Sequence, residues 1–312
     1  MLKISVILCT YNRCQSLKKA LGSIAVSVLP SPVEWEVLVV DNNSKDQTRE
    51  IVEDFSRRFP RRFRYLFEPQ QGKSNALNTG IRCARGDILA FVDDDVTVEP
   101  NWLQNLTATL DDKQWAGAGG RILPEQTFML PCWLSLEGPY EMGGVLVFFD
   151  RGEKPGELDW APYGTNMAFR REMFDKYGAF RADLGPKPGS EIRGEDVEFG
   201  RRLKAAGERL WYEPSAVVYH EVPEKRLRKD YFLAWWFDFG RALVREWGRG
   251  PDFLGIPRPY LSILKTLMTR MPRTAAQWIL ASQPQQRFFF KARLWREAGE
   301  VAEFYSLARN RD

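Results

Sequence analysis

Four short apolar runs, each rich in β-branched residues, alternate with helix-like segments over the first 92 residues of this chain. The runs predicted as strands are 3–10 (KISVILCT), 36–41 (EVLVVD), 64–67 and 87–92 (DILAFV). The segments between them, predicted as helices, are 15–28, 45–59 and 74–84. Strands that are apolar throughout and separated by helices are typical of a parallel sheet covered on both faces. The pattern therefore predicts an α/β fold in which the carboxyl ends of the strands share one edge, where such sheets bind ligands.

This alternation breaks after a further apolar run, 117–123. The next segment, 124–162, is rich in glycine, proline and aromatic residues, with one strand expected at 145–149. Regular structure is predicted again beyond it. Strands are expected at 166–170, 209–212 and 216–220, with a glycine-rich loop at 185–194. Helices are expected at 172–177, 196–206, 228–247, 260–268 and 286–308. A boundary near Pro251 would separate a domain of residues 1–250 from a helical extension, 251–312.

Basic residues are concentrated in the C-terminal part of the chain. The net charge of +4 over 312 residues is too small to indicate a nucleic-acid partner. Between 249 and 296, however, nine basic residues stand against the single acid Asp252. These nine are Arg249, Arg258, Lys265, Arg270, Arg273, Arg287, Lys291, Arg293 and Arg296. With the leucine, phenylalanine and tryptophan residues among them, they suit a helix on an anionic membrane surface. The alternative is a helical appendage that packs on the first domain or on another subunit.

The sequence predicts neither a membrane-spanning nor a secreted protein. No stretch reaches the roughly 18 uncharged apolar residues of a spanning helix, and the apolar N-terminal run is too short for a signal peptide. Cys9, Cys14, Cys83 and Cys132 have no CxxC spacing, so we expect free thiols in a reducing cytoplasm. The expected location is cytoplasmic, with peripheral contact to the membrane through the basic extension.

Three adjacent carboxylates follow the fourth predicted strand, in AFVDDDV. Asp93, Asp94 and Asp95 are therefore expected at the ligand-binding edge. Packed carboxylates either bind a cation or raise one another's pKa. Oxygen ligands on a turn suit Mg²⁺ or Mn²⁺, which keep positions open for substrate phosphates. The alternative is a solvated acidic turn that caps the helix expected to start near 99–101.

Two other strands end in polar residues at the same edge. Residues 10–13 (TYNR) follow the first strand, and Asp41 ends the second in VVDNNSKD. Asp41 could bind a ligand or form an Asx turn, and Asn43 or Ser44 is expected to cap the helix at 45–59. Three strand ends thus bring polar groups and an arginine to one place, which predicts a binding site.

Three further motifs each have a structural interpretation beside a functional one. Lys73, in QGKSN before the third helix, suits an anion through backbone N–H groups and charge, or belongs to an ordinary loop and cap. His220 ends the strand AVVYH and is the only histidine; its imidazole could complete a metal site or be satisfied within the fold. Glu195 and Asp196 open a helix, where the helix dipole favours acids. Either could also be a general base if it reaches the attacking hydroxyl.

Six sequence blocks occur in an order that resembles family 2 glycosyltransferases of GT-A fold. The blocks are SVILCTYNR, VVDNNSKDQT, QGKSNALNTGI, AFVDDDV, GTNMAFRREMF and GEDVEFGRRLKAAG. The resemblance covers about residues 3–245 and implies a Rossmann-like, mostly parallel sheet flanked by helices. It also implies a nucleotide-sugar half, 1–123, and an acceptor half, 124–250, within the first domain.

The resemblance implies an inverting transfer from a nucleoside diphosphate sugar, with uridine favoured by Asp41, to a hydroxyl of a glycan or lipid-linked acceptor. Asp196 is implied as the general base, with Glu195 as its neighbour. Asp95 and His220 are implied as ligands of Mn²⁺ or Mg²⁺, and this ion, shared with the diphosphate, would be the positive partner of the acidic cluster. The residues implied in nucleotide-sugar binding are Thr10, Tyr11, Arg13, Asp41, Lys73, Asn78, Asp93, Asp94 and Asn166. The QxxRW block of processive members is absent, which favours transfer of one or a few sugars.

Other classes of function account for fewer of these features. A nucleotidyltransferase acting on sugar phosphates would have a glycine-rich loop close after the first strand, but TYNRCQSLKK contains no glycine. A glycoside hydrolase could use Asp95 and Asp196 as its two carboxylates, which leaves the nucleotide-like features without a purpose. A catalytically silent nucleotide-sugar or membrane-binding module is the third alternative, and the intact DDD and ED blocks speak against it.

Overall fold

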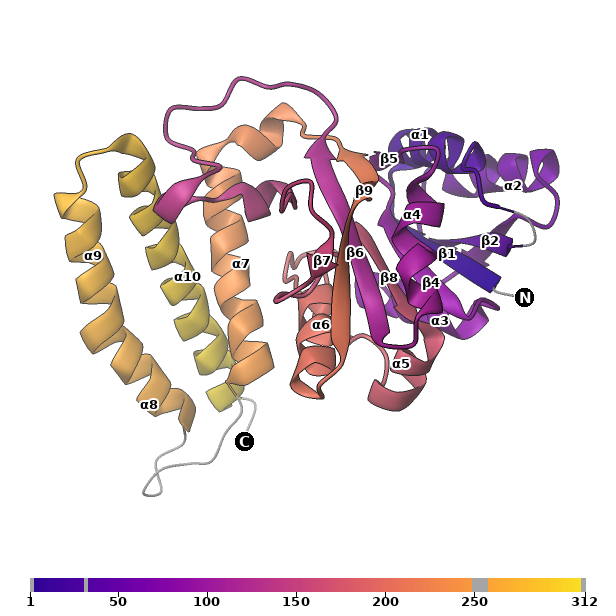
Figure 1. The fold of residues 1–312 in the computed structure, drawn as a ribbon. Coiled ribbons are helices and arrows are strands. Elements are labelled where there is room, and N and C mark those ends of the chain that lie inside the picture. Colours follow the sequence, from indigo (N-terminus) through magenta and orange to yellow (C-terminus); the bar gives the residue numbers. More distant parts are fainter. Residues whose placement is uncertain (1–2, 31–32, 249–257, 310–312) are drawn as a thin grey trace. The chain divides into compact units, whose positions relative to one another are not determined.

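The computed structural model describes residues 3–30, 33–248 and 258–309, which group into two compact units (Figure 1). The first unit comprises Met1–Gln126, Val147–Pro188 and Glu195–Glu221. The second comprises Thr127–Leu146, Gly189–Gly194 and Val222–Asp312. The boundary predicted near Pro251 lies outside the described residues, so the division into 1–250 and 251–312 stays a prediction.

The first unit is built on a mixed sheet of nine strands among the described residues. The strands are β1 Lys3–Thr10, β2 Glu34–Asp41, β3 Phe63–Phe67, β4 Ile88–Asp93, β5 Val96–Val98, β6 Trp115–Pro124, β7 Gly156–Glu157, β8 Asn166–Arg170 and β9 Arg209–His220. Their spatial order is β3-β2-β1-β4-β8-β6-β9-β5, and β7 pairs with β9. Strands β1 to β4 pair in parallel, whereas β8 runs antiparallel to both of its neighbours. The predicted α/β class is confirmed, with an antiparallel strand inserted in the middle of the sheet.

Helices cover both faces of this sheet. They are α1 Cys14–Ala25, α2 Thr48–Arg58, α3 Lys73–Cys83, α4 Trp102–Ala108, α5 Arg171–Tyr177 and α6 Glu195–Ala205. In Figure 1, α1 and α2 lie together on one side of the parallel strands and α3 lies on the other. This follows from right-handed crossovers, because the chain moves outward from β1 to β3 and then returns to β4 on the far side of β1.

A cluster of phenylalanine rings holds α6 against the sheet. The rings of Phe174 on α5 and Phe199 on α6 stack with centroids 4.5 Å apart. Phe199 also meets Phe169 of β8 edge to face, at 5.0 Å. Full burial of each such side chain contributes roughly 1.5–3 kcal/mol. The start of α6, where Glu195 and Asp196 lie, is therefore anchored to the central strands.

The structure differs from the predicted elements in three regions of the chain. Residues 145–149 form no strand; a 3₁₀ turn at Gly143–Leu146 replaces it, and Phe149 makes only an isolated bridge to Ile122. The two strands predicted at 209–212 and 216–220 are one strand, β9, which stays paired with β6 across a register shift. Helix α2 begins at Thr48 and not at residue 45, and its cap position is Gln47, not Asn43 or Ser44. The Thr48 N–H donates its hydrogen bond to Asp46.

The second unit is helical. Its helices are α7 Lys229–Trp247, α8 Arg258–Lys265, α9 Met271–Leu280 and α10 Pro284–Arg309, and a π-helical turn at Thr266–Arg270 joins α8 to α9. Helices α7 and α10 cross in close contact at two glycines. A methyl group on Gly240 would lie 2.0 Å from the Arg296 carbonyl oxygen, and one on Gly299 would lie 1.9 Å from that of Phe237. The predicted C-terminal helices are confirmed, and α10 packs on α7 within this unit. Among the described residues, no helix has both the length and the apolar character needed to cross a bilayer.

Candidate active site

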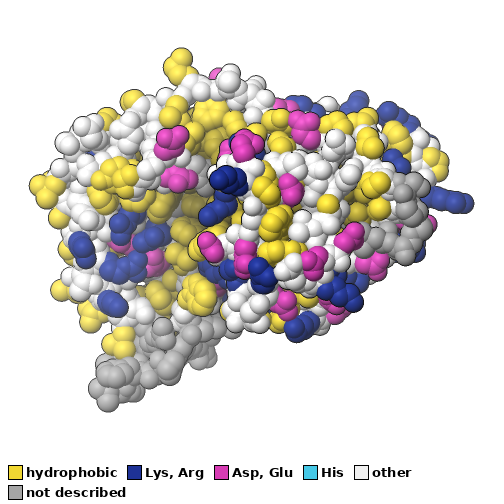
Figure 2. All heavy atoms as spheres, viewed as in Figure 1, with side chains coloured by type: hydrophobic (Ala, Val, Ile, Leu, Met, Phe, Trp, Pro, Cys, Tyr) yellow, Lys and Arg dark blue, Asp and Glu magenta, His cyan; other side chains and the backbone are white. Residues whose placement is uncertain are grey.

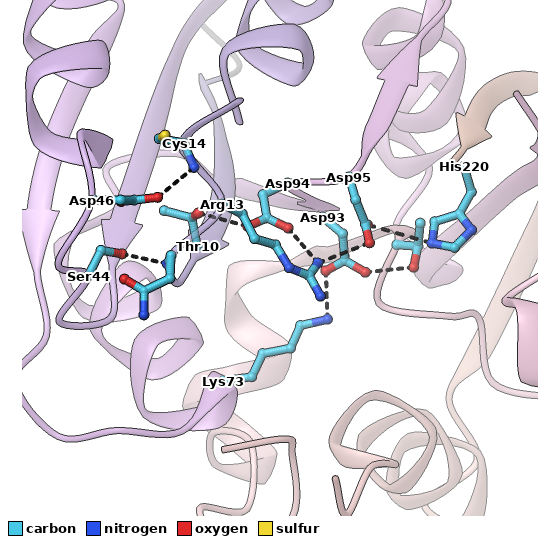
Figure 3. A network of polar contacts seen from close by, with 12 residues as sticks. Thr10, Arg13, Cys14, Ser44, Asp46, Lys73, Asp93, Asp94, Asp95 and His220 are labelled. Atoms are coloured by element: carbon cyan, nitrogen blue, oxygen red, sulfur yellow. Dashed lines mark hydrogen bonds and ion pairs between the residues drawn. The ribbon is translucent and has the colours of Figure 1, made fainter. Parts of the chain in front are cut away.

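The carboxyl ends of β1, β2 and β4 meet at one edge of the sheet. The strand register places Thr10 beside Asp41 and Cys9 beside Asp93. The predicted convergence of the three strand ends is therefore present in the structure. The loops that follow β1 and β2 are joined by hydrogen bonds: the Ser44 hydroxyl accepts the N–H of Asn12, and Asp46 accepts the N–H of Cys14 (Figure 3).

Arg13 neutralises two of the three acids of the DDD block. One of its guanidinium nitrogens lies 3.1 Å from an Asp94 oxygen and 3.0 Å from an Asp95 oxygen (Figure 3). The Thr10 hydroxyl donates a 2.7 Å hydrogen bond to Asp94. Burial raises the pKa of Asp94 to about 6, with Asp95 adding to the effect and Arg13 opposing it. Burial alone would lower the pKa of Arg13, but Asp94 and Asp95 outweigh it and hold that pKa above its ordinary value.

Lys73 is the cation beside the remaining acid, Asp93. Its ammonium group lies 2.6 Å from one Asp93 oxygen, and the Thr165 hydroxyl donates to the other at 2.7 Å. Burial alone would raise the pKa of Asp93, but Lys73 and these hydrogen bonds hold it below its ordinary value. Lys73 also lies 3.9 Å from Glu195, so the cation stands between the DDD block and the start of α6.

Glu195 and Asp196 differ in exposure. Glu195 is buried, whereas Asp196 is partly exposed and accepts the N–H of Gly164 at 2.6 Å. Burial and the charge of Asp196 raise the pKa of Glu195 to about 7, and Lys73 partly opposes this. Of the two acids, Asp196 is therefore the more accessible to solvent.

The raised pKa of Glu195 predicts a pH-dependent loss of stability. A folded-state pKa of about 7 lies above the ordinary 4.5, so stability present at acidic pH is lost as the pH rises through 7. Glu195→Gln removes the ionisation. We expect it to raise the free energy of unfolding by on the order of 1–3 kcal/mol at about pH 8 and to change it little at about pH 5. Urea unfolding at both pH values measures this, and an equal effect at both would contradict it.

His220 and Asp95 lie side by side. The Nε2 atom of His220 is 3.6 Å from an Asp95 oxygen, because β9 pairs with β5 so that His220 is opposite Val96 (Figure 3). His220 is buried. Within the described ranges, no three or more His, Cys, Asp or Glu side chains are grouped so as to hold a metal ion. Any ion at this pair would need further ligands from substrate and water.

Asp41 is buried and already engaged by the protein. One oxygen accepts the N–H of Ser44 at 2.9 Å, and the other accepts the Tyr65 hydroxyl at 2.8 Å. Burial and this bond to Asp41 raise the pKa of Tyr65 to about 12. Asp41 thus orders the loop after β2, and each of its oxygens keeps a second lone pair. Tyr11, by contrast, is 38% exposed at the same edge.

Asn166 and Asn78 make hydrogen bonds within the fold. The Asn166 side chain is buried; it accepts the Trp102 indole N–H and donates to the carbonyls of Arg121 and Ala216. The Asn78 amide forms hydrogen bonds with both backbone groups of Phe180. Both side chains therefore hold backbone in place, and the expectations that Asn166 lies beside the donor sugar and that Asn78 borders the phosphates stay predictions.

Thr165 is a site residue that the sequence interpretation missed. It precedes Asn166 in the block GTNMAFRR and forms the 2.7 Å hydrogen bond to Asp93. Successive side chains of a strand point to opposite faces. Thr165 itself lies in the turn just before β8, so the sequence pattern gave no signal for its contact with Asp93.

The chain is similar to known glycosyltransferases in sequence. Residues 5–178, more than half of the chain, match the family described as Glycosyl transferase family 2. A glucosyl-dolichyl phosphate glucuronosyltransferase of Haloferax volcanii is 27% identical over 249 residues, which are 78% of this chain and 77% of that protein. The succinoglycan biosynthesis protein ExoM of Rhizobium meliloti is 31% identical over 236 residues, 75% of this chain and 70% of that protein.

The fold is also that of solved glycosyltransferases. The mannosyltransferase PcManGT from Pyrobaculum calidifontis, solved with GDP-Man and Mn²⁺, has a TM-score of 0.65 at 21% identity, over 97% of this chain and 87% of that one. Staphylococcus aureus TarS, residues 1–349, has a TM-score of 0.54 at 18% identity, over 99% of this chain and 92% of that one. The predicted fold, a GT-A-type sheet flanked by helices, is confirmed. The chain belongs to glycosyl transferase family 2 and is a glycosyltransferase.

Proposed function

We propose that this enzyme transfers one or a few sugars, with inversion, from a nucleoside diphosphate sugar to a hydroxyl of a glycan or lipid-linked acceptor. The observation that carries the proposal is the position of Asp196. It is a partly exposed carboxylate at the start of α6, next to Glu195. Glu195 lies 3.9 Å from the ammonium group of Lys73, which pairs with Asp93. A direct displacement requires a base for the attacking hydroxyl and positive charge for the departing diphosphate.

Asp196 is proposed as the general base. It takes the proton of the acceptor hydroxyl while the acceptor oxygen forms a bond to the anomeric carbon. The bond from that carbon to the diphosphate oxygen breaks, and its electron pair leaves with the nucleoside diphosphate. Because the attack is direct and no covalent intermediate on the protein is formed, the configuration at the anomeric carbon inverts. A base placed in this way typically contributes about 10²- to 10⁴-fold to the rate.

Arg13 and Lys73 are proposed to bind the diphosphate. In the structure these two cations are paired with the DDD block, at 3.0 Å to Asp95 and 2.6 Å to Asp93. A diphosphate entering the site offers them oxygens of higher charge, and charge-assisted hydrogen bonds to phosphate are among the strongest in proteins. Thr10 and Asp94 hold Arg13 in place, and the exposed ring of Tyr11 is proposed to pack on the nucleotide.

Asp95 and His220 are proposed to hold Mn²⁺ or Mg²⁺. A carboxylate is a suitable donor for Mn²⁺ or Mg²⁺, and a neutral imidazole can also bind a metal ion. Their 3.6 Å separation lets both face one ion. When bound, the ion would neutralise negative charge on the departing diphosphate. The presence of Mn²⁺ in the complex of PcManGT supports this assignment. Arg13 contacts Oδ2 of Asp95, whereas the imidazole of His220 faces Oδ1, so Oδ1 is the oxygen proposed to meet the ion.

The base, acceptor and compartment complete the proposal. Asp41 at the end of β2 makes uridine our choice, although one structural neighbour is a complex with GDP-Man and another with UDP-GlcNAc. A lipid-linked acceptor is supported by the dolichyl phosphate in the name of the Haloferax volcanii relative. The basic C-terminal segment would bring the enzyme to an anionic membrane surface. The four cysteines of the chain are free thiols, which fits the cytoplasmic side of the membrane.

Release of nucleoside diphosphate tests the proposal. The purified enzyme is incubated with a panel of UDP-, GDP- and dTDP-sugars, simple glycoside or lipid-phosphate acceptors, and Mn²⁺ or Mg²⁺. We expect release with a UDP-sugar, loss of release with EDTA, and recovery with excess metal. Release that is insensitive to EDTA would overturn the metal assignment. Pyrophosphate formation from a nucleoside triphosphate and a sugar phosphate would instead support a nucleotidyltransferase.

A further inference from the structure

The segment formed by α8, the π-helical turn and α9 buries its polar side. Thr266 and Thr274 are each only 2% exposed. The Thr274 hydroxyl donates a 2.9 Å hydrogen bond to Glu297 of α10, and Arg270 makes a two-point ion pair with Glu300, one turn further along the same face of α10. A helix of a water-soluble protein ordinarily turns its apolar side to its neighbours. This segment is held to α10 by polar groups.

Its apolar side faces outward. Six large apolar residues of the segment are between 46% and 82% exposed. We define them as the outer face: Tyr260, Leu264, Leu267, Met268, Ile279 and Leu280. The first four have spacings of four, three and one residues, which place them on one side of a helix. Single exposed apolar residues are normal, but six in one segment whose threonines are buried indicate a surface that something covers.

The charged residues of the segment that carries the outer face are all basic. No aspartate or glutamate occurs from Arg258 to Arg296. Lys265 and Arg273 are exposed within the segment itself. Figure 2 shows hydrophobic side chains over the outer side of α9, at the left edge of the view, and Lys and Arg side chains gathered over the strip between α9 and α10.

We propose that the outer face docks on an anionic lipid surface, with its six apolar side chains among the acyl chains and Lys265 and Arg273 at the headgroups. Apolar residues flanked by basic ones are what an interfacial helix needs. A second copy of this chain fits less well, since a symmetric contact would bring Lys265 and Arg273 of both copies together. This inference deepens the proposed function and rests on it in one respect. The purpose of membrane docking depends on a lipid-linked acceptor, whereas the binding of the outer face to lipid does not.

Vesicle sedimentation of the full-length enzyme tests the docking surface. The protein is mixed with vesicles of phosphatidylcholine alone, or with about a third phosphatidylglycerol. We expect binding to the anionic vesicles that falls as salt rises. Each methylene withdrawn from water strengthens partitioning about fourfold, so Leu264→Gln with Met268→Gln should weaken it at least about tenfold. Lys265→Gln and Arg273→Gln should each weaken it about fivefold on anionic vesicles only.

A matched pair outside the outer face serves as the control. Val26 and Met129 are 64% and 92% exposed, and Val26→Gln with Met129→Gln should leave binding unchanged. Circular dichroism and thermal melting confirm that each variant is folded. Absence of binding to anionic vesicles, or equal loss in both double variants, would overturn the proposal. If the enzyme sediments as a dimer, and Leu264→Gln with Met268→Gln dissociates it, the outer face is instead a contact with a second copy. Sugar transfer to a soluble acceptor, measured separately, fails only if the proposed function is wrong.

Discussion

Asp196→Asn is expected to lower kcat by about 10²- to 10⁴-fold while leaving the affinity for the nucleotide sugar nearly unchanged. The amide has the size of the carboxylate, and its oxygen can still accept the N–H of Gly164, which lies 2.6 Å from Asp196 in the structure. What the amide lacks is the ability to take a proton from the acceptor. The loss should therefore appear in the chemical step, measured as product formation at saturating donor and acceptor.

The control for this variant is an acid on the same helix. Glu198 pairs with Arg202 at 2.7 Å, four residues along α6, so Glu198→Gln changes a charge near Asp196 without removing the proposed base. We expect it to keep kcat within a few-fold. Titration of the Asp196→Asn protein with nucleoside diphosphate separates the two roles. Loss of nucleotide binding would assign Asp196 to the donor site, and an unchanged kcat would exclude it as the base.

The parallel half of the fold could be predicted from the sequence because its signals are local. Strand β1 has the predicted bounds, and the DDD block lies at the end of β4 because a continuous apolar run leads into it. The convergence of three strand ends needs only the rule that parallel strands finish at one edge. In this part of the chain, local pattern and global topology agree.

The side-chain roles beyond the sheet could not be predicted in the same way. The contact of Thr165 with Asp93 depends on how the neighbouring strand β8 is paired with β4 and β6, which is a long-range property. The same holds for Asn78, whose partner Phe180 is far away in sequence. The sequence predicted a metal ion as the positive partner of the acids; the structure adds Arg13 and Lys73, whose proximity arises only when separate loops fold together.

Lys73→Met should be the most destabilising change at the site. Removing the ammonium group leaves Asp93 and Glu195 without the cation between them, at 2.6 and 3.9 Å. Breaking a buried pair from one side costs about 3–5 kcal/mol. Because 24% of the Lys73 side chain is exposed, we expect a smaller loss, about 2–3 kcal/mol. Chemical denaturation at neutral pH measures it.

Two further variants decide whether this loss comes from the uncompensated charge. Lys19 lies as close to Glu125, at 2.6 Å, but is 55% exposed. Lys19→Met should cost only about 0–1 kcal/mol. Adding Asp93→Asn to Lys73→Met removes the acid as well, so the double variant should be more stable than Lys73→Met alone. If Asp93→Asn gives no recovery, Lys73 stabilises the fold through its packing, and the DDD block does not need a cation in the free enzyme.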